Sequence, residues 1–587
     1  MSVIAAPELL ELGESLPPQD PHGVSVHLPK WADTVGWATR EPRVLKEMRT
    51  GYPRFFIPRV ADRLAMQLLG LHESKIALAR EAGGSKSGAQ LGLVLSTLRH
   101  AQLCRQALCA WNPRQHQISP TDVGVYIVGW EGQITAVEED GDPPRHPETV
   151  SSEAIGTEDI FLVSYPAELA LEAKAFWQHT GFGISSRRAT HWLRNAPFLS
   201  GTTVFPSVDN TEMRNKVRWA SSQLKRRIAV GQAARSDGMT LAEDDVFLYQ
   251  AGMTAIVEIA ATIKSLRPPS PDSAYRVAVF GFLYVDTYKV LNRVLGYAPA
   301  LYKYSAVDID AFEALLASDP TLRFSALFTE FPGNPLLQSP DLARLHALAR
   351  KYDFVLVVDD TVGTYANVSV LGSCDIVCTS LTKMFSGGCN VMGGAAVLSP
   401  WSPHYREMKA SLRQQREEAE RAWYWEDVVV MEANSRDFEA RVATASANAE
   451  AVVAMLRRHG SVREVYYPKG SPTQDIYDRY KLPGGGYGFL LSIRFTSAAE
   501  AVVFYDALDV AKGPSLGTNF TLCCAYTLLA HYKELDWAAE YGVVEDLVRI
   551  SVGLEVRSWL EDRIAKALRA TERCEEGSRR AASRTRL

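Results

Sequence analysis

The sequence lacks the features that mark several special classes of protein. None of its apolar runs approaches the length of a membrane-spanning helix, so a membrane protein is not expected. The first residues, MSVIAAPELLELGESLPPQD, are acidic and have no basic segment ahead of an apolar core, which argues against a secretory signal and favours a cytoplasmic location. A formal net charge of −5 over 587 residues gives no indication of binding to nucleic acid.

Metal-binding patterns and internal repeats are missing too. The eight cysteines show no zinc-ligand spacing, and Cys523 and Cys524 are adjacent and cannot easily share a site. Without a secretory signal, all the cysteines are expected to be reduced and mostly buried thiols. A content of 47% hydrophobic and 22% charged residues is typical of soluble globular protein, so an ordinary packed core is expected.

The chain is too long for one ordinary core, and the first part of it has no chemical motif. Residues 1–205 form an N-terminal region with mixed apolar segments. An acidic, proline-rich stretch at 138–153 interrupts this region and indicates a flexible insert. The segment ELALEAKAFWQHTGFGISSRRATHWL predicts a helix, a glycine turn and a second helix capped by Ser185 or Ser186.

From about residue 245, short apolar runs alternate with helical stretches. The runs RVAVFGF, SALFTEF, FVLVVDD and DIVCTS indicate buried strands. They predict an α/β fold with a mostly parallel sheet, covered on both faces, in a large domain over 206–400. Residues 401–572 change to polar helices followed by strands such as YGFLLSIRF, which predicts a smaller α+β domain. The basic end, 573–587, is expected to be a disordered tail.

In such a sheet, ligands bind beyond the carboxyl ends of the strands. Lys383 follows the strand DIVCTS, where an ammonium group must lose much of its water. Desolvation lowers the pKa of a lysine and favours the nucleophilic amine that forms a Schiff base. Asp359 directly follows FVLVV, and a carboxylate there can pair with a protonated ring nitrogen. Gly252 and Met253 lie between a strand and a helix, where free backbone N–H groups bind phosphate.

Three further residues extend this constellation. Ser380 and Thr382 place hydroxyl groups beside the lysine, and Tyr284 offers an aromatic face to a flat heterocycle. Each of these residues taken alone is better explained by a turn, a cap or packing. A phosphate cradle, a stacking ring, an acid for a ring nitrogen and an amine for an aldehyde, taken together, predict pyridoxal 5'-phosphate (PLP) as the cofactor.

The sequence resembles the PLP-dependent enzymes of cysteine and methionine metabolism, and among these trans-sulfuration enzymes the fungal cystathionine γ-synthase-like branch. The resemblance is carried by YQAGMTAI, FGFLYVDTYKVL, FTEFPGNPLL, VVDDTVGTY, SLTKMFSGGCNVMGG, PSLGTNFTL and VRISVGLE, and upstream by GYPRFFIP and AFWQHTGFGISSRRA. It implies fold type I of the PLP-dependent transferases, with an aspartate aminotransferase-like large domain, a small C-terminal domain and an extra N-terminal region. It also implies a homo-oligomer, either a dimer or a tetramer.

The same resemblance implies a role for each residue at the cofactor. Lys383 carries PLP as a Schiff base and then moves protons, while Asp359 keeps the pyridine nitrogen protonated. Tyr284 stacks on the ring and assists the proton transfers, and Asn334, in GNP, hydrogen-bonds the phenolic oxygen. The phosphate is bound by Gly252, Met253, Ser380 and Thr382.

Around the substrate and the phosphate, the sequence matches the family pattern at one element and departs from it at another. Arg549, in VRISVG, is implied to bind the substrate α-carboxylate with Ser515 nearby, a task that suits the planar fork of a guanidinium group. The family also has a Tyr-x-Arg element ahead of the phosphate turn, which reaches the phosphate in the neighbouring subunit. The corresponding stretch, TTVFPSVDNTEMRNKVRW, contains none. Arg214 and Arg218 are candidate substitutes; the alternative is a clamp that is weaker or lost.

The implied reaction is a γ-replacement on an O-acyl-L-homoserine by a nucleophilic co-substrate. Cysteine as the nucleophile would give cystathionine in primary metabolism, whereas a stabilised carbon nucleophile would form a carbon–carbon bond. The departure at the clamp favours a role in secondary-metabolite biosynthesis over primary trans-sulfuration. Two alternatives stay open: a lyase in which water completes the reaction, and a non-catalytic partner subunit, which the intact Lys383, Asp359 and Arg549 oppose.

Overall fold

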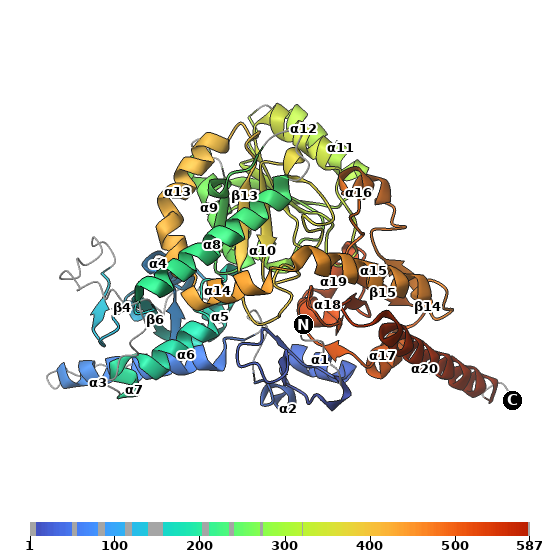
Figure 1. Cartoon of the computed structure of the whole chain (residues 1–587), viewed down its shortest axis with the longest axis horizontal. Helices are drawn as coiled ribbons and strands as arrows, with labels where there is room; N and C mark the ends of the chain where they lie inside the picture. Colours follow the sequence, from blue (N-terminus) through green and yellow to red (C-terminus); the bar gives the residue numbers. More distant parts are fainter. Residues whose placement is uncertain are drawn as a thin grey trace.

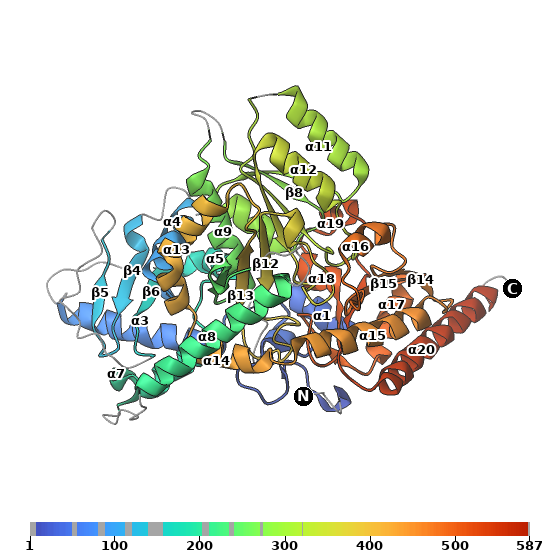
Figure 2. The same ribbon diagram turned by 45° about the horizontal axis from the view of Figure 1, so that its top comes forward.

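Three sheets of four or more strands organise the described part of the chain. The computed structural model describes residues 7–49, 56–79, 89–111, 120–138, 156–201, 210–233, 240–269, 274–319 and 321–584. A central sheet lies between an N-terminal and a C-terminal sheet (Figure 1), and a second view separates the two outer sheets in the same way (Figure 2). Beyond Glu138, the predicted insert at 138–153 lies outside the described residues. Within those residues, no helix is long and apolar enough to cross a membrane.

The central sheet has seven strands in the order β7-β13-β12-β11-β10-β8-β9. Neighbouring strands pair in parallel except at β13, which is antiparallel to both β12 and β7. All except the edge strand β9 are buried over most of their length, as their uninterrupted apolar runs predict, and the expected mostly parallel α/β sheet is confirmed. The strands are β7 (Val246–Tyr249), β8 (Arg276–Phe280), β9 (Ala298–Tyr302), β10 (Ala326–Glu330), β11 (Val355–Asp359), β12 (Ile376–Ser380) and β13 (Gly394–Leu398).

Helices cover both faces of this sheet. Leu224, Phe312 and Leu345 bring α8, α11 and α12 into the core on one face, where α14 also packs. The other face is covered by α9 and α13, so α13 packs on the large domain although residues from 401 onward were predicted to belong to the small one. The helices are α8 (Asn210–Ala233), α9 (Gly252–Leu266), α10 (Val285–Lys289), α11 (Ala306–Ser318), α12 (Leu342–Tyr352), α13 (Tyr405–Ala422) and α14 (Trp425–Asn434).

The C-terminal sheet has five strands in the order β14-β15-β18-β17-β16. Its core is closed by α15, α17 and α20. The tail predicted to be disordered from residue 573 is helical as far as Arg584, because residues rich in good helix formers continue α20. The elements are β14 (Val462–Tyr466), β15 (Leu490–Phe495), β16 (Ala511–Lys512), β17 (Leu522–Ala525), β18 (Val548–Ser551), α15 (Phe438–Leu456), α16 (Gln474–Tyr480), α17 (Ala498–Ala507), α18 (Tyr526–His531), α19 (Leu535–Glu540) and α20 (Arg557–Arg584).

The N-terminal sheet is antiparallel, in the order β3-β6-β4-β5. Helices α3 and α6 pack on one face, and α4 and α5 on the other, where the core continues into that of the large domain. The predicted helix–turn–helix is confirmed: α5 ends at Thr180, its C-cap Gly181 has φ +71°, and Ser185 caps α6. The elements are α3 (Arg59–Ala79), β3 (Gln90–Leu95), α4 (Leu98–Ala110), β4 (Gly124–Val128), β5 (Ile134–Ala136), β6 (Ile160–Pro166), α5 (Ala170–Thr180), α6 (Ser186–Asn195) and α7 (Pro197–Ser200).

The first described residues lie elsewhere, against the small domain. They contain β1 (Ser15–Leu16), β2 (Ser25–Val26), α1 (Trp31–Ala38) and α2 (Pro42–Leu45). The backbone N–H of Leu28 donates to the carbonyl of Lys512 at 2.8 Å, and the Tyr505 hydroxyl donates to the carbonyl of Leu28 at 2.9 Å. The region predicted as one unit over 1–205 therefore packs in two places.

The core shared by α5 and the large domain generates a stability prediction. Phe176 on α5 has an exposed fraction of 0%, and Phe176→Ala is expected to lower the free energy of unfolding by about 3–5 kcal/mol through the cavity it leaves. Leu171→Ala on the same helix is the matched control, because Leu171 is 63% exposed. Urea unfolding of both variants measures the difference, and equal stabilities would contradict the shared core.

Candidate active site

One cavity, of about 170 Å³, gathers every residue predicted for the site. Asp359 ends β11, Ser380 ends β12, and Tyr284 follows β8, so the cavity lies at the carboxyl ends of the parallel strands, as expected for this type of sheet. The N-terminal region also contributes to its wall. The predicted residues that line the cavity are Gly252, Met253, Tyr284, Asn334, Asp359, Ser380, Thr382, Lys383, Ser515 and Arg549.

Lys383 is buried at this cavity with its backbone held firmly. Its side-chain amine donates to the Ser515 hydroxyl at 3.2 Å. The turn after it is fixed by Arg441 of α15, a fully buried guanidinium that donates to the carbonyl oxygens of Met384 and Phe385, each at 2.7 Å. Sequence reasoning missed Arg441; the only signal was one arginine among the small and apolar residues of ARVATASANAEAVVAML. The lysine amine is thereby held in a fixed position in the cavity.

Asp359 meets the requirement of a ring nitrogen partner. Burial raises the pKa of its carboxyl group, against a hydrogen bond from the backbone N–H of Thr361 at 2.8 Å and the charge of Lys383, which lower it. A buried carboxyl group of this kind is stabilised in its ionised form by a cation placed beside it. The protonated pyridine nitrogen of PLP is such a cation.

The start of α9 fits a phosphate group. Gly252 is the first residue of the helix, and a Cβ atom there would lie 2.7 Å from the Cβ of Ser380, so a glycine is needed for the close approach. The helix N-terminus offers free backbone N–H groups, and Ser380 adds a hydroxyl. Thr382 is positioned by the backbone of Gly393, whose N–H donates to the Thr382 hydroxyl at 3.1 Å. Together with Asp359 and Lys383, these residues fit PLP.

Glu330, which ends β10, positions two residues of the site and was not predicted. Its carboxylate accepts the backbone N–H of Tyr284 at 2.6 Å and that of Asn334 at 3.1 Å. Burial and the neighbouring Asp359 raise the pKa of Glu330 well above its usual range. Its signal in the sequence was a glutamate at the end of the apolar run SALFTEF, the same pattern that identified Asp359.

Arg549 of β18 is oriented by neutral groups. It donates to the side-chain oxygen of Asn334 and to the carbonyl of Ser515, both at 2.8 Å, and its guanidinium lies 4.7 Å from the ring centre of Tyr526. No carboxylate in the described part of the chain forms an ion pair with it, so its charge is available to an acidic ligand. Ser515 has φ +94°, a strained conformation that places its carbonyl on Arg549 and its hydroxyl on Lys383.

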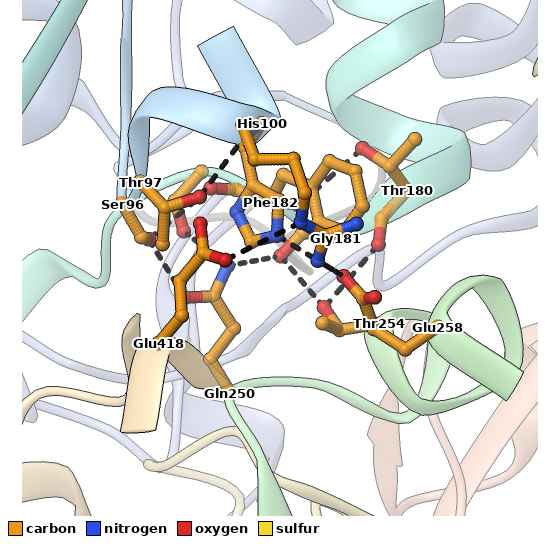
Figure 3. Close-up of polar contacts among 12 residues, drawn as sticks. Ser96, Thr97, His100, Thr180, Gly181, Phe182, Gln250, Thr254, Glu258 and Glu418 are labelled. Carbon is orange, nitrogen blue, oxygen red and sulfur yellow. Dashed lines mark hydrogen bonds and ion pairs between the residues drawn. The ribbon is translucent and has the colours of Figure 1, made fainter. Parts of the chain in front are cut away.

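The N-terminal region holds the backbone of the phosphate turn (Figure 3). Gln250, two residues before α9, donates to the carbonyl of Gly181 at 2.8 Å and accepts the Ser96 hydroxyl at 2.7 Å. Thr254, in the first turn of α9, donates to the carbonyl oxygens of Thr180 at 3.3 Å and Gly181 at 3.2 Å. The turn that follows α5 therefore acts as a brace for the turn that starts α9.

A buried charged group strengthens this brace. Glu258 of α9 accepts a hydrogen bond from His100 at 3.2 Å and forms an ion pair with Arg99, both from α4. Burial opposes ionisation of Glu258, yet these two partners lower its pKa. The His100 ring stacks on Phe182 with the ring centres 3.6 Å apart. These contacts, invisible in the sequence because they join distant segments, assign a positioning role to part of the N-terminal region.

The candidate substitutes for the Tyr-x-Arg element lie away from this site. Arg214 and Arg218 are both exposed on α8, and neither lines the cavity of its own chain.

The fold and the site define a PLP-dependent enzyme of fold type I. The sequence model of the Cys/Met metabolism PLP-dependent enzymes matches residues 239–569, and that of the N-terminal domain of fungal trans-sulfuration enzymes matches residues 70–185. The chain belongs to the Cys/Met metabolism family of PLP-dependent enzymes, and its cofactor is accordingly PLP.

Known proteins align along nearly the whole chain. A cystathionine γ-synthase of Neurospora crassa is 37% identical, covering 96% of this chain and 98% of that protein. The cystathionine γ-synthase-like enzyme iboG2 of Amanita muscaria is 35% identical over 97% and 98%. The cystathionine γ-synthase-like protein ankD of Aspergillus thermomutatus is 34% identical, covering 96% of this chain and 94% of that protein.

A solved structure shares the fold over a smaller part of the chain. The crystal structure of a cystathionine γ-synthase from Xanthomonas oryzae pv. oryzae is 22% identical and aligns with a TM-score of 0.51, covering 61% of this chain and 87% of that one.

The close approach at Gly252 generates a prediction about cofactor binding. Gly252→Ala forces Ser380 to shift, and because overpacking costs about 1–3 kcal/mol, the affinity for PLP is expected to fall by about tenfold or more. Titration of the apoprotein with PLP, followed by visible absorbance, measures this affinity. Gly372→Ala is the control, because no atom lies within 4 Å of a Cβ there. Equal affinities for PLP in the two variants would contradict phosphate binding at the start of α9.

Proposed function

We propose that this protein is a transferase that replaces the γ-substituent of an O-acyl-L-homoserine with a carbon or sulfur nucleophile. The arrangement of Lys383, Ser515 and Arg549 carries the proposal. Ser515 contacts the amine of Lys383 at 3.2 Å through its hydroxyl and the guanidinium of Arg549 at 2.8 Å through its carbonyl. An amino acid whose carboxylate binds Arg549 therefore presents its Cα close to the Lys383 amine.

Each residue has a defined task in this reaction. PLP, when bound, supplies an aldehyde and an electron-withdrawing ring that stabilises negative charge at Cα. Arg549 binds and orients the α-carboxylate, with its own direction set by Asn334 and Ser515. Lys383 removes the proton from Cα and later returns a proton to the carbon skeleton, a task that requires its fixed position. Asp359 holds the proton on the ring nitrogen.

The exchange at Cγ balances without an oxidant or reductant. The bond from Cγ to the ester oxygen breaks, and the acyl group leaves as a carboxylate with the bonding electron pair. The nucleophile then forms its bond to the same carbon and gives up one proton. The net products are the substituted amino acid and a free carboxylic acid.

Two versions of this function have support. A specialised biosynthetic role is supported by the missing Tyr-x-Arg element and by the similarity to the synthase-like enzyme iboG2 and the synthase-like protein ankD. Cystathionine formation in primary metabolism is supported by 37% identity to the Neurospora crassa enzyme. We place the specialised role first, in a cytoplasmic homo-oligomer whose large domain, over 206–400, also carries α13 and α14.

Product analysis tests the proposal. The holoenzyme is incubated with O-acetyl-L-homoserine alone, with L-cysteine and with acetoacetate, and the products are identified by mass spectrometry, with Lys383→Ala as the inactive control. A product that joins the four-carbon unit to either nucleophile, together with acetate, is expected. Release of 2-oxobutanoate and ammonia under all conditions would identify a lyase, and an unconsumed donor would favour a non-catalytic subunit.

The orientation of Arg549 generates a kinetic prediction. Arg549→Ala removes a charge-assisted pair with the substrate carboxylate, which contributes about 1.5–3 kcal/mol, so KM for O-acetyl-L-homoserine is expected to rise by about 10- to 100-fold. Steady-state kinetics with a saturating nucleophile measures this change. Arg276→Ala, at an exposed position where β8 begins, serves as the control. A KM equal to that of the wild type would exclude Arg549 from carboxylate binding.

A further inference from the structure

A second cavity, of about 440 Å³, adjoins the active-site cavity. Gln178 of α5 and Leu529 and Ala530 of α18 line both cavities, so a ligand in one lies next to a ligand in the other. Its wall combines α1 and the residues from there to Met48, the start of α3, α5 of the N-terminal region, α10, and the segment from the end of α18 to Glu534. No single segment supplies the site.

The polar lining of this cavity is strongly basic. The only carboxylate among its described lining residues is Glu534, which already accepts from Lys289 at 3.3 Å and from His531 at 3.0 Å. Among the residues that the structure describes, the guanidinium of Arg59 donates only to the backbone carbonyl of Lys46, at 3.2 Å. The basic residues of the lining are Arg40, Arg59, Lys174, Lys289 and Lys533. Most of the positive charge therefore has no acidic partner in the wall.

Lys174 is the clearest example of a cation in this wall without an acidic partner. Its ammonium has no hydrogen bond or ion pair within the described parts of the chain, and it lies 5.9 Å from the ring centre of Trp37. Burial, followed by the charges of Arg40 and Lys533, lowers the pKa of Lys174 to about 8. A partly desolvated ammonium among like charges is unstable by itself, and a bound anion would supply the missing opposite charge.

We propose that this cavity binds the acidic group of the nucleophilic co-substrate, and that the preferred nucleophile is a carboxylic acid without an amino group. The inference rests on the proposed γ-replacement. The α-carboxylate of the amino-acid donor is assigned to Arg549, which lines the first cavity and not the second. The second cavity is thus left for an acid that arrives with the other reactant.

The charge of the cavity discriminates between nucleophiles. An amine-free thiol acid or β-keto acid brings one negative charge and gains from every cation in the wall. Cysteine brings an ammonium group as well, which the same cations repel. Selectivity therefore arises from repulsion of the wrong nucleophile as well as from attraction of the right one.

Two thiols with the same reacting atom test this assignment. The holoenzyme converts O-acetyl-L-homoserine with 3-mercaptopropionate, which is anionic, or with 2-mercaptoethanol, which is neutral. The ratio of their kcat/KM values is measured in the wild type, in Lys174→Met with Lys533→Gln, and in the control Lys566→Gln, an exposed lysine on α20. The double variant is expected to lower the ratio by about tenfold or more, because hydrogen bonds to charged groups contribute about 1.5–3 kcal/mol, while the control keeps it.

The outcomes separate the possible failures. If the wild type joins neither these thiols nor acetoacetate to the donor, the proposed function itself fails. If it joins acetoacetate alone, the same ratio is measured for acetoacetate, which is anionic, against the neutral acetylacetone. If it joins both thiols and the ratio is the same in all variants, the anion site is refuted while the function stands. A third arm compares O-succinyl- with O-acetyl-L-homoserine, using 2-mercaptoethanol as the nucleophile. A loss in the double variant that is confined to the succinyl donor would assign the cavity to the leaving acyl group and overturn the assignment to the nucleophile.

Discussion

The contact between Lys383 and Ser515 is the interaction on which the rest of the site depends. It joins the large domain, which carries the lysine after β12, to the small domain, whose strained residue Ser515 also receives Arg549. Catalysis by a lysine that moves protons requires an amine held in one place as well as one with a suitable pKa. The buried guanidinium of Arg441 helps to fix the position of the lysine, because it donates to the carbonyl groups of the two residues that follow it.

The N-terminal region holds in place the turn at the start of α9, which we propose binds the cofactor phosphate. Gln250 and Thr254 flank the turn that starts α9, and both are hydrogen-bonded to the turn after α5. Glu258 adds a buried charged contact one turn further along the same helix. A phosphate site made of backbone N–H groups is only as rigid as its backbone, so the brace fits the proposed role of this turn in binding the phosphate of PLP. The same region, with Lys174, also forms part of the basic cavity.

The sequence predicted what depends on local pattern. Lys383 and Asp359 were predicted because each follows an apolar run, and the structure places both at the same edge of the parallel sheet. The helix that starts at Gly252 was predicted from its strand–turn–helix pattern and is confirmed. Glu330 ends an apolar run just as Asp359 does. The sequence alone does not distinguish the role of Glu330, which accepts backbone N–H groups, from the role proposed for Asp359, which is to pair with the pyridine nitrogen. Arg441 and the basic cavity could not be found, because their partners lie far away along the chain.

The central claim is that Lys383 is the lysine that binds the cofactor. Reduction of the holoenzyme with sodium borohydride, followed by proteolysis and mass spectrometry, tests it directly, because reduction makes the bond between PLP and its lysine permanent. The account predicts a pyridoxyl phosphate group on the peptide that contains Lys383. Labelling of another lysine, such as Lys174 or Lys512, whose pKa values are lowered by burial, or no labelling at all, would contradict it.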